Sequence, residues 1–206
     1  MPIRETLFQS LEDRGWAVAD GLAPEGLPDR LARECRALWQ AGGFRPAEVG
    51  RGERQSRQDT IRGDSIRWLD PDSAGAASRE FLAWIASFRR DLNQAFYLGL
   101  NSQEFHFARY PAGAGYTRHL DQHRGGAARK VSVTLYLNPG WPADGGGELC
   151  LYPPTEEPGM AEFVLPVQGR MAVFLSDIIP HEVRPAAQTR WSLTGWLRTD
   201  TPGVPV

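Results

Sequence analysis

The amino-acid sequence predicts a mainly β fold, an antiparallel sandwich or barrel with its early helices packed outside. Two observations lead to this prediction. Apolar residues recur with helical spacing in the first half of the chain, and from residue 105 onward they alternate with a period of two. The strand-like runs follow one another without helices between them, separated by clusters of Gly, Pro and Asp. This density of short strands favours an antiparallel arrangement over a parallel sheet.

Three amphipathic helices are predicted ahead of these strands. The first has its apolar residues on one face over positions 3–11 and ends at Gly15, before a short strand with the sequence WAVAD. The second covers residues 27–38. The third and clearest covers residues 81–96 and closes at Gly99.

Six strands are predicted in the second half of the chain. In order, they read FHFARY, KVSVTLYLN, ELCLYP, EFVLPV, RMAVFLS and RWSLTGWLR. The earlier stretch 42–60 is rich in Gly and Arg, has neither period and is long for a connection. It is interpreted either as a mobile loop or as an ordinary solvated one.

Length and charge limit the classes of protein to which the chain can belong. At 206 residues we expect a single domain over 1–206, with helical support in about 1–100 and a β core in about 101–200. The net charge of −2 gives no field that attracts nucleic acid or an anionic membrane, and no apolar stretch reaches membrane-spanning length. The N-terminal segment lacks the apolar core of a signal peptide, so a cytoplasmic protein is expected.

The two cysteines, Cys35 and Cys150, lie far apart in the sequence and within apolar-patterned segments. Their spacing fits no metal-binding motif. We therefore expect two buried thiols and no disulfide.

Candidate metal ligands come from the β half. His119 and His181 lie at strand-like positions, and Asp121 follows His119 by two residues. Because side chains alternate along a strand, His119 and Asp121 are expected on one face. With His181 they would form the two-histidine, one-carboxylate facial triad of non-haem iron(II) oxygenases, which leaves coordination positions open for a 2-oxoacid and dioxygen. A closed tetrahedral site would leave no such room.

A His-x-Asp tripeptide alone occurs by chance in many chains, so the residues that follow it decide its meaning. Arg190 lies nine residues after His181, in the strand-like segment TRWSLTGWLR. A guanidinium fork deep in a barrel can hold the distal carboxylate of 2-oxoglutarate through two parallel hydrogen bonds, which a lysine cannot do. The four residues together indicate iron and 2-oxoglutarate chemistry.

A family resemblance is carried by six segments: IRGDSIRWLD, RYPAGAGYTRHLD, VTLYLNPGW, GGELCLYP, FLSDIIPHEVRPA and TRWSLTGW. They resemble the 2-oxoglutarate oxygenases of the prolyl 4-hydroxylase type, above all the hypoxia-inducible-factor prolyl hydroxylases and their bacterial relatives. The resemblance covers roughly residues 55–200. It implies a double-stranded β-helix, a jelly-roll variant, with the N-terminal helices packed outside. It also implies that His119, Asp121 and His181 bind iron(II), while Arg190 binds the cosubstrate.

The resemblance implies further pocket residues. Tyr136 would share the distal carboxylate, Tyr110 and Thr194 would line the same pocket, and Trp196 would pack near the metal, although ordinary core packing is an alternative for the aromatic residues. A separate Arg-Gly-Asp element at residues 62–64 matches one that follows a substrate-covering loop in the family. The stretch 42–60 would then be that loop.

The activity implied is hydroxylation of a prolyl residue in a protein or peptide, with iron(II) as cofactor and 2-oxoglutarate and dioxygen as cosubstrates, and with release of succinate and carbon dioxide. The loop QHRGGAA after Asp121 departs from the animal members, so the identity of the substrate protein stays open, as does the oligomeric state. Two alternatives remain: a related oxygenase acting on a free amino acid or small molecule, and a non-catalytic metal-binding jelly-roll sensor. Arg190 argues against the sensor, which needs no buried carboxylate anchor.

The other two histidines receive structural interpretations. His119 and His123 are four residues apart and could bind zinc from one helix face. The surrounding glycines disfavour a helix there, and the glutamate of an H-E-x-x-H motif is missing, so His123 is interpreted as lying outside the ligand set. His106, in the strand FHFARY, is expected to be a satisfied sheet residue.

Overall fold

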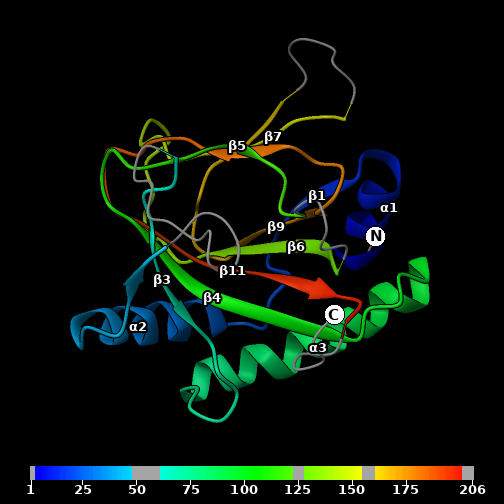
Figure 1. Cartoon of the computed structure of the whole chain (residues 1–206), viewed down its shortest axis with the longest axis horizontal. Coiled ribbons are helices and arrows are strands. Elements are labelled where there is room, and N and C mark those ends of the chain that lie inside the picture. The colour runs from blue at the N-terminus through cyan, green and yellow to red at the C-terminus, as the bar shows by residue number, and fades with distance from the viewer. Residues whose placement is uncertain (1–2, 48–60, 123–127, 155–160, 201–206) are drawn as a thin grey trace, which may run out of the picture.

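The computed structural model describes residues 3–47, 61–122, 128–154 and 161–200. Two antiparallel sheets face each other in this part of the chain (Figure 1). The larger sheet contains β1 (Trp16–Asp20), β2 (Arg45–Pro46), β3 (Ser65–Trp68), β4 (Ser102–Tyr110), β6 (Arg129–Tyr136), β9 (Arg170–Leu175) and β11 (Arg190–Arg198), in the order β1-β9-β6-β11-β4-β3-β2. The smaller sheet contains β5 (Tyr116–His119), β7 (Leu149–Leu151), β8 (Glu162–Val164) and β10 (His181–Val183), in the order β5-β10-β7-β8.

Three helices lie outside the sheets: α1 (Ile3–Arg14), α2 (Leu27–Gln40) and α3 (Ala76–Phe96). Figure 1 shows α2 and α3 below the larger sheet, on the side away from the smaller sheet, and α1 near β1. This confirms the predicted mainly β jelly roll with N-terminal helices packed outside. Helix α1 ends at Gly15, as predicted, where the backbone takes a positive φ of 80°.

Helix α3 begins at a different residue from its prediction, and its C-terminal capping residue also differs. It starts five residues earlier, at Ala76, where the carboxylate of Glu34 from α2 accepts a hydrogen bond from the Ala77 backbone N–H at 3.0 Å. A side chain distant in sequence thus satisfies the free N–H groups of the first turn. The helix ends at Phe96, and the capping residue is Tyr97, which takes the left-handed conformation usually left to glycine, and not Gly99.

Two apolar clusters account for the layering. The larger one lies between the helices and the larger sheet and includes Phe81, Ile85 and Phe88 of α3 together with Leu193 of β11. The smaller one lies between the two sheets. The first half of the chain therefore packs on the β core and also supplies β1, β2 and β3 to the larger sheet.

The two cysteines behave as the sequence predicted. Both cysteines are buried and free, as predicted, and burial raises the pKa of the Cys35 thiol to about 12. The short strands β2 and β3 were not predicted.

Most of the proposed substrate-covering loop, residues 48–60, lies outside the described residues, as does His123. In the described part of the chain, no helix combines the length and apolar character needed to cross a membrane.

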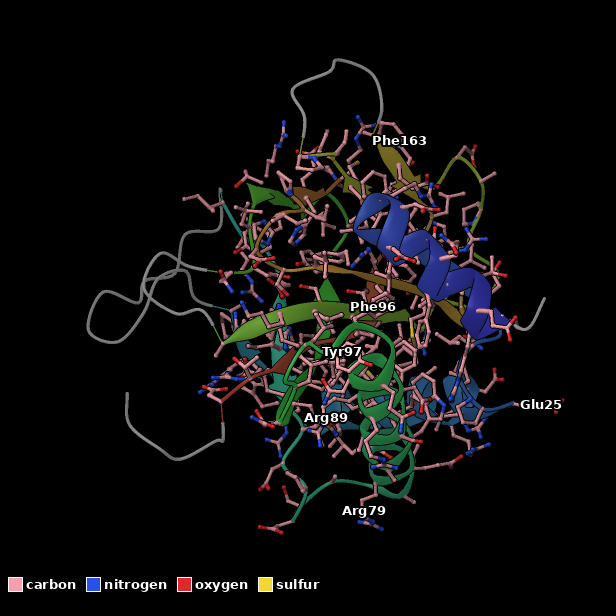
Figure 2. All side chains as sticks on the ribbon, turned by 90° about the vertical axis from the view of Figure 1, so that its right-hand side faces the viewer. Glu25, Arg79, Arg89, Phe96, Tyr97 and Phe163 are labelled. Atoms are coloured by element: carbon pink, nitrogen blue, oxygen red, sulfur yellow. The ribbon has the colours of Figure 1, made fainter. Side chains whose placement is uncertain are left out.

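The burial of α3 gives a test of the fold with two aromatic residues. Phe88 is fully buried in the larger cluster. Tyr97, which follows the last residue of the same helix and is labelled in Figure 2, is 90% exposed. Phe88→Ala should lower the free energy of unfolding by about 3–5 kcal/mol through lost burial and the cavity it leaves. Tyr97→Ala, the matched control, should change it by no more than about 0.5 kcal/mol. Urea unfolding measures both; similar losses for the two variants would contradict the packing described.

Candidate metal and cosubstrate site

A cavity lies between the two sheets, and strand alternation explains what faces it. Its walls come from β4, β6, β9 and β11 of the larger sheet, from β5, β7 and β10 of the smaller one, and from Arg62 and Asp64 just before β3. Along β11, every second side chain points into the cavity and the side chains between them pack against the helices. The cavity residues of β11 are Arg190, Ser192, Thr194 and Trp196, and the helix-facing residues are Trp191, Leu193 and Leu197.

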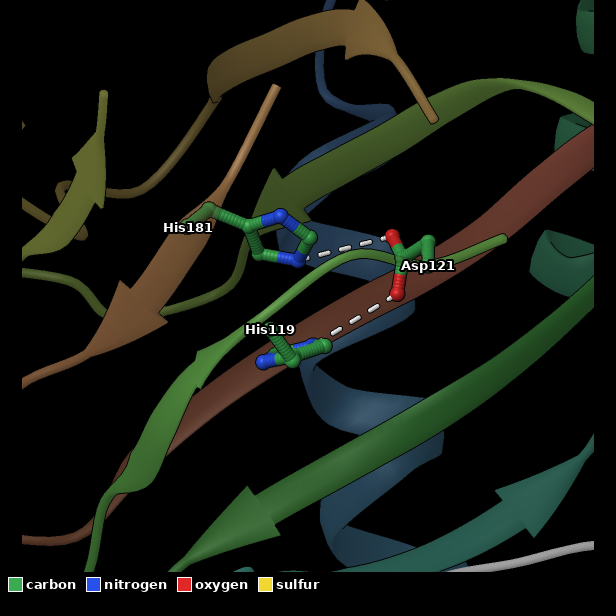
Figure 3. Close-up of side chains that lie close together, drawn as sticks. All are labelled: His119, Asp121 and His181. Carbon is green, nitrogen blue, oxygen red and sulfur yellow. Dashed lines mark ion pairs between the residues drawn. The ribbon is translucent and has the colours of Figure 1, made fainter. Parts of the chain in front are cut away.

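Three of the predicted residues meet at one side of this cavity (Figure 3). His119 ends β5, His181 begins β10, and Asp121 follows β5 in a bend. The Nε2 atoms of His119 and His181 lie 3.6 and 3.5 Å from the two carboxylate oxygens of Asp121. The potential ligand atoms of the three residues all lie within 4.8 Å of one another. The predicted convergence is confirmed, although Asp121 reaches it from beyond the strand and not by alternation within it.

Backbone carbonyl groups orient both imidazoles. Nδ1 of His119 lies 2.8 Å from the carbonyl oxygen of Thr117, and Nδ1 of His181 lies 3.1 Å from that of Ile179. A carbonyl oxygen can only accept, so each Nδ1 carries the proton. Each Nε2 then faces the Asp121 carboxylate, and this tautomer leaves Nε2 as the nitrogen that can bind a metal.

The charge states also suit a metal. Burial raises the pKa of the Asp121 carboxyl group, but the nearby His181 and His119 and the Ser132 hydroxyl, which donates a hydrogen bond of 2.7 Å, outweigh burial and hold that pKa below its usual value. Burial lowers the pKa of His181. A charged carboxylate beside a neutral imidazole is the combination that binds a metal ion without first losing a proton.

Arg190 is a buried cation at the other end of the cavity. Its side chain is 2% exposed, and its Nε donates a hydrogen bond of 2.9 Å to the carbonyl oxygen of Gly147. No carboxylate among the described residues pairs with it. A buried charge without a partner is costly, so the cavity is suited to an anion at this end.

The other predicted pocket residues lie around Arg190 and along the cavity. Its guanidinium carbon lies 5.3 Å from the ring centroid of Tyr110 and 5.0 Å from that of Tyr136. Tyr110 and Thr194 line the cavity. Tyr136 is fully buried beside Arg190 but is not among the lining residues, and Trp196 lines the cavity with an exposure of 5%.

Sequence reasoning missed Tyr116. Arg62 and Asp64 form a two-point ion pair, with Nε–Oδ1 and Nη2–Oδ2 distances of 2.7 and 3.0 Å. The Arg62 guanidinium carbon lies 5.0 Å from the ring centroid of Tyr116, and the Tyr116 ring stacks on that of His119 with centroids 3.6 Å apart. Residues three apart on a regular strand face opposite sides. A register shift between β5 and β10 brings these two together, and no sequence pattern indicated it.

The hydroxyl groups of Thr134 and Ser192, which lie beside that of the predicted Thr194, were also missed. The Oγ1 atom of Thr194 lies 3.3 Å from that of Thr134 and 3.2 Å from Oγ of Ser192. His106, expected to be satisfied within its sheet, lines the same cavity, and its Nδ1 has no hydrogen-bond partner among the described residues. That expectation was wrong, because His106 points away from the helix-facing side of β4 and into the cavity.

The residues present fit an iron(II) ion with a dicarboxylate cosubstrate. His119, Asp121 and His181 are the group of metal-ligating side chains found in the described part of the chain. Two imidazoles and one carboxylate on one side of a metal leave its other positions open, as iron(II) oxygenases require. Arg190 in the same cavity supplies the cationic fork for a carboxylate.

Similarity to known proteins supports iron and 2-oxoglutarate chemistry at this site. A family model described as the 2OG-Fe(II) oxygenase superfamily, where 2OG is 2-oxoglutarate, matches residues 105–198. The chain is similar to the crystal structure of a Pseudomonas putida prolyl-4-hydroxylase, with 42% identity and a TM-score of 0.85 over 96% of this chain and 100% of that one. It is also similar to a Trichoplax adhaerens prolyl hydroxylase solved in complex with a hypoxia inducible factor oxygen degradation domain peptide fragment, with 28% identity and a TM-score of 0.82 over 95% and 88% of the two chains.

A curated human protein, Egl nine homolog 1, is 32% identical over 203 residues, which cover 93% of this chain and 46% of that protein. The chain spans about half the length of the first curated relatives it matches. The match to the Pseudomonas putida structure, in contrast, covers the full length of both molecules, or nearly so. On this evidence the chain belongs to the 2OG-Fe(II) oxygenase superfamily, within its prolyl 4-hydroxylase type.

Proposed function

We propose that this chain hydroxylates a prolyl residue in a protein or peptide, using iron(II), 2-oxoglutarate and dioxygen and releasing succinate and carbon dioxide. The observation that carries the proposal is one cavity holding both a His-Asp-His cluster and a buried arginine without a carboxylate partner. Relatives named as prolyl hydroxylases, one of them solved with a peptide fragment, support a prolyl substrate in a polypeptide.

Each residue has a role in this proposal. His119, Asp121 and His181 hold the iron, which when bound supplies the oxidising chemistry. Arg190 binds the distal carboxylate of 2-oxoglutarate, with Tyr136 beside it. Because both imidazoles already donate from Nδ1 to backbone carbonyls and Asp121 is held by Ser132, the ligand set is oriented before the metal arrives.

Tyr110 and Thr194 line the cosubstrate pocket in this proposal. Burial keeps bulk water from the Arg190 guanidinium group, which strengthens its ionic contact with the cosubstrate. His119, with its side chain 18% exposed, lies toward the outside of the cavity, where a peptide could approach. A buried Arg190 also favours an oxygenase over a metal-binding sensor, which needs no anion site. Two free, buried cysteines are compatible with the cytoplasmic location that we propose.

Iron binding and cosubstrate turnover test the metal ligands. The purified protein should bind one iron(II) ion per chain and slowly release succinate from 2-oxoglutarate in air. His119→Ala, Asp121→Ala and His181→Ala should each lose most of the bound iron and the succinate, because each removes a ligand. Tyr97→Ala, an exposed change outside the cavity, should retain both. Undiminished succinate release by all three ligand variants would refute the metal site.

Arg190 tests the cosubstrate site independently of the metal. Arg190→Ala should weaken 2-oxoglutarate binding by roughly thirtyfold to several thousandfold, since truncating one member of a buried charge pair typically costs about 2–5 kcal/mol. Arg190→Lys should be intermediate, because it keeps the charge but loses the fork. The measurement is an anaerobic titration of the iron-loaded protein with 2-oxoglutarate, followed by its metal-to-ligand absorption band. Near-native affinity in an iron-loaded Arg190→Ala protein would place the anchor elsewhere.

The prolyl specificity needs its own test. Proline-containing peptides from a cell lysate digest should gain one oxygen atom when incubated with the iron-loaded protein and 2-oxoglutarate, and fragment-ion spectra should place that oxygen on proline. The Asp121→Ala variant is the blank. Oxygen gain confined to other residues, or to free amino acids, would leave the oxygenase assignment standing and overturn the prolyl one.

A further inference from the structure

His106 occupies the metal end of the cavity. On β4 it pairs with Thr194 of β11, which in turn pairs with Thr134 of β6. The next cavity-facing row toward the end of β11 contains Ser132, whose hydroxyl binds Asp121. Arg190 precedes Thr194, the β11 partner of His106, by four residues, which is about 13 Å along the strand at roughly 3.3 Å per residue. His106 and Arg190 thus lie toward opposite ends of one cavity.

The ring of His106 is held rigidly but its polar atoms are unused. It packs against two indoles, with its ring centroid 4.7 Å from that of Trp68 and 5.5 Å from that of Trp196, and the indoles also contact each other. The residue is 2% exposed, and its Nδ1 is sealed from solvent without a partner among the described residues. No hydrogen bond to Nε2 is found among them either. Buried polar groups are seldom left unsatisfied, so the missing partner is expected in the cavity that the ring lines.

The surroundings define what that partner can be. Burial, together with the nearby guanidinium groups of Arg62 and Arg129, lowers the pKa of His106 well below its usual value, so the imidazole is neutral and carries one N–H donor. Both guanidinium groups already have carboxylate partners, Asp64 for Arg62 and Glu104 for Arg129, so among the described residues the free polar group at this end is the imidazole itself. An oxygen of a carboxylate accepts the strongest hydrogen bond that a neutral N–H can give here.

We propose that His106 is a cosubstrate-binding residue, whose imidazole N–H donates a hydrogen bond to the metal-side carboxylate of the 2-oxoacid. This inference rests on the proposed function. His106 and Arg190 then hold the two carboxylates of 2-oxoglutarate, one at each end of the cavity. A monocarboxylate gains only one of these contacts, so the pair also selects for a dicarboxylate.

A matched pair of variants separates hydrogen bonding from packing. Gln and Met have similar length, but only Gln keeps an N–H donor, so His106→Gln should retain most of the affinity and His106→Met should lose about tenfold or more. The probes are 2-oxoglutarate and oxalate, titrated calorimetrically into protein loaded with Mn(II), which does not turn over. Oxalate presents the metal-side carboxylate without the distal one. His106→Met should therefore weaken both probes by a similar factor, whereas Arg190→Lys should weaken 2-oxoglutarate alone.

The possible results are distinguishable. Equal affinities of the Gln and Met variants for oxalate would overturn the inference, as would a His106→Met loss seen with 2-oxoglutarate but not with oxalate. Manganese content and thermal unfolding identify a variant that fails to fold; His106→Asn and His106→Leu then replace the pair as a second donor and non-donor comparison. Failure of the unmodified, metal-loaded protein to bind 2-oxoglutarate would instead refute the proposed function itself.

Discussion

Strand β11 enters the larger sheet between β4 and β6, and its register decides what the cavity contains. Because side chains alternate, a slip of one residue would move Arg190 into the apolar layer under the helices and Leu193 into the cavity. Asn138 holds this register at the start of the strand. Its amide exchanges two hydrogen bonds with the backbone of Trp191, of 2.9 and 2.7 Å, one residue from Arg190. The anion site and the helix-facing core are therefore specified together.

The same register places opposite charges at a distance within one cavity. Asp121 is a buried carboxylate beside the imidazoles of His119 and His181, and Arg190 is a buried guanidinium with no carboxylate partner among the described residues. Because the cavity separates them, the Asp121 carboxylate and the Arg190 guanidinium do not neutralise each other. Each is therefore suited to a ligand of opposite charge: a metal cation beside Asp121 and a carboxylate beside Arg190. A site built in this way binds its ligands with little rearrangement, because burial of the charges is already complete in the folded chain. Ligands that bind only the folded chain should also stabilise it.

Much of the fold could be predicted because the two faces of a strand have different surroundings, and this difference appears in the sequence as alternating residue types. Strands such as β4, β6 and β11 are long and alternate, and α3 presents a continuous apolar stripe to them. The elements that were missed carry too few residues for a period to be visible. β2 has two residues and β3 has four. β3 forms because β4 offers an edge with free backbone groups, and β2 pairs in turn with β3. The start of α3 was misplaced for a related reason, since it is capped by Glu34 from another helix.

The sequence by itself determined the residue types of the site and their order: two imidazoles, a carboxylate and, nine residues after the second imidazole, an arginine in a strand. These follow from local chemistry and spacing. The tertiary structure decided which neighbours complete them. Tyr116 stacks on His119 because a register shift overrides strand alternation. Ser132 of β6 donates a hydrogen bond to Asp121, which follows β5 of the other sheet, and His106 lines the cavity without a partner for Nδ1 among the described residues. Such contacts join residues distant in sequence, or break the local period, and are set by how the two sheets close on each other.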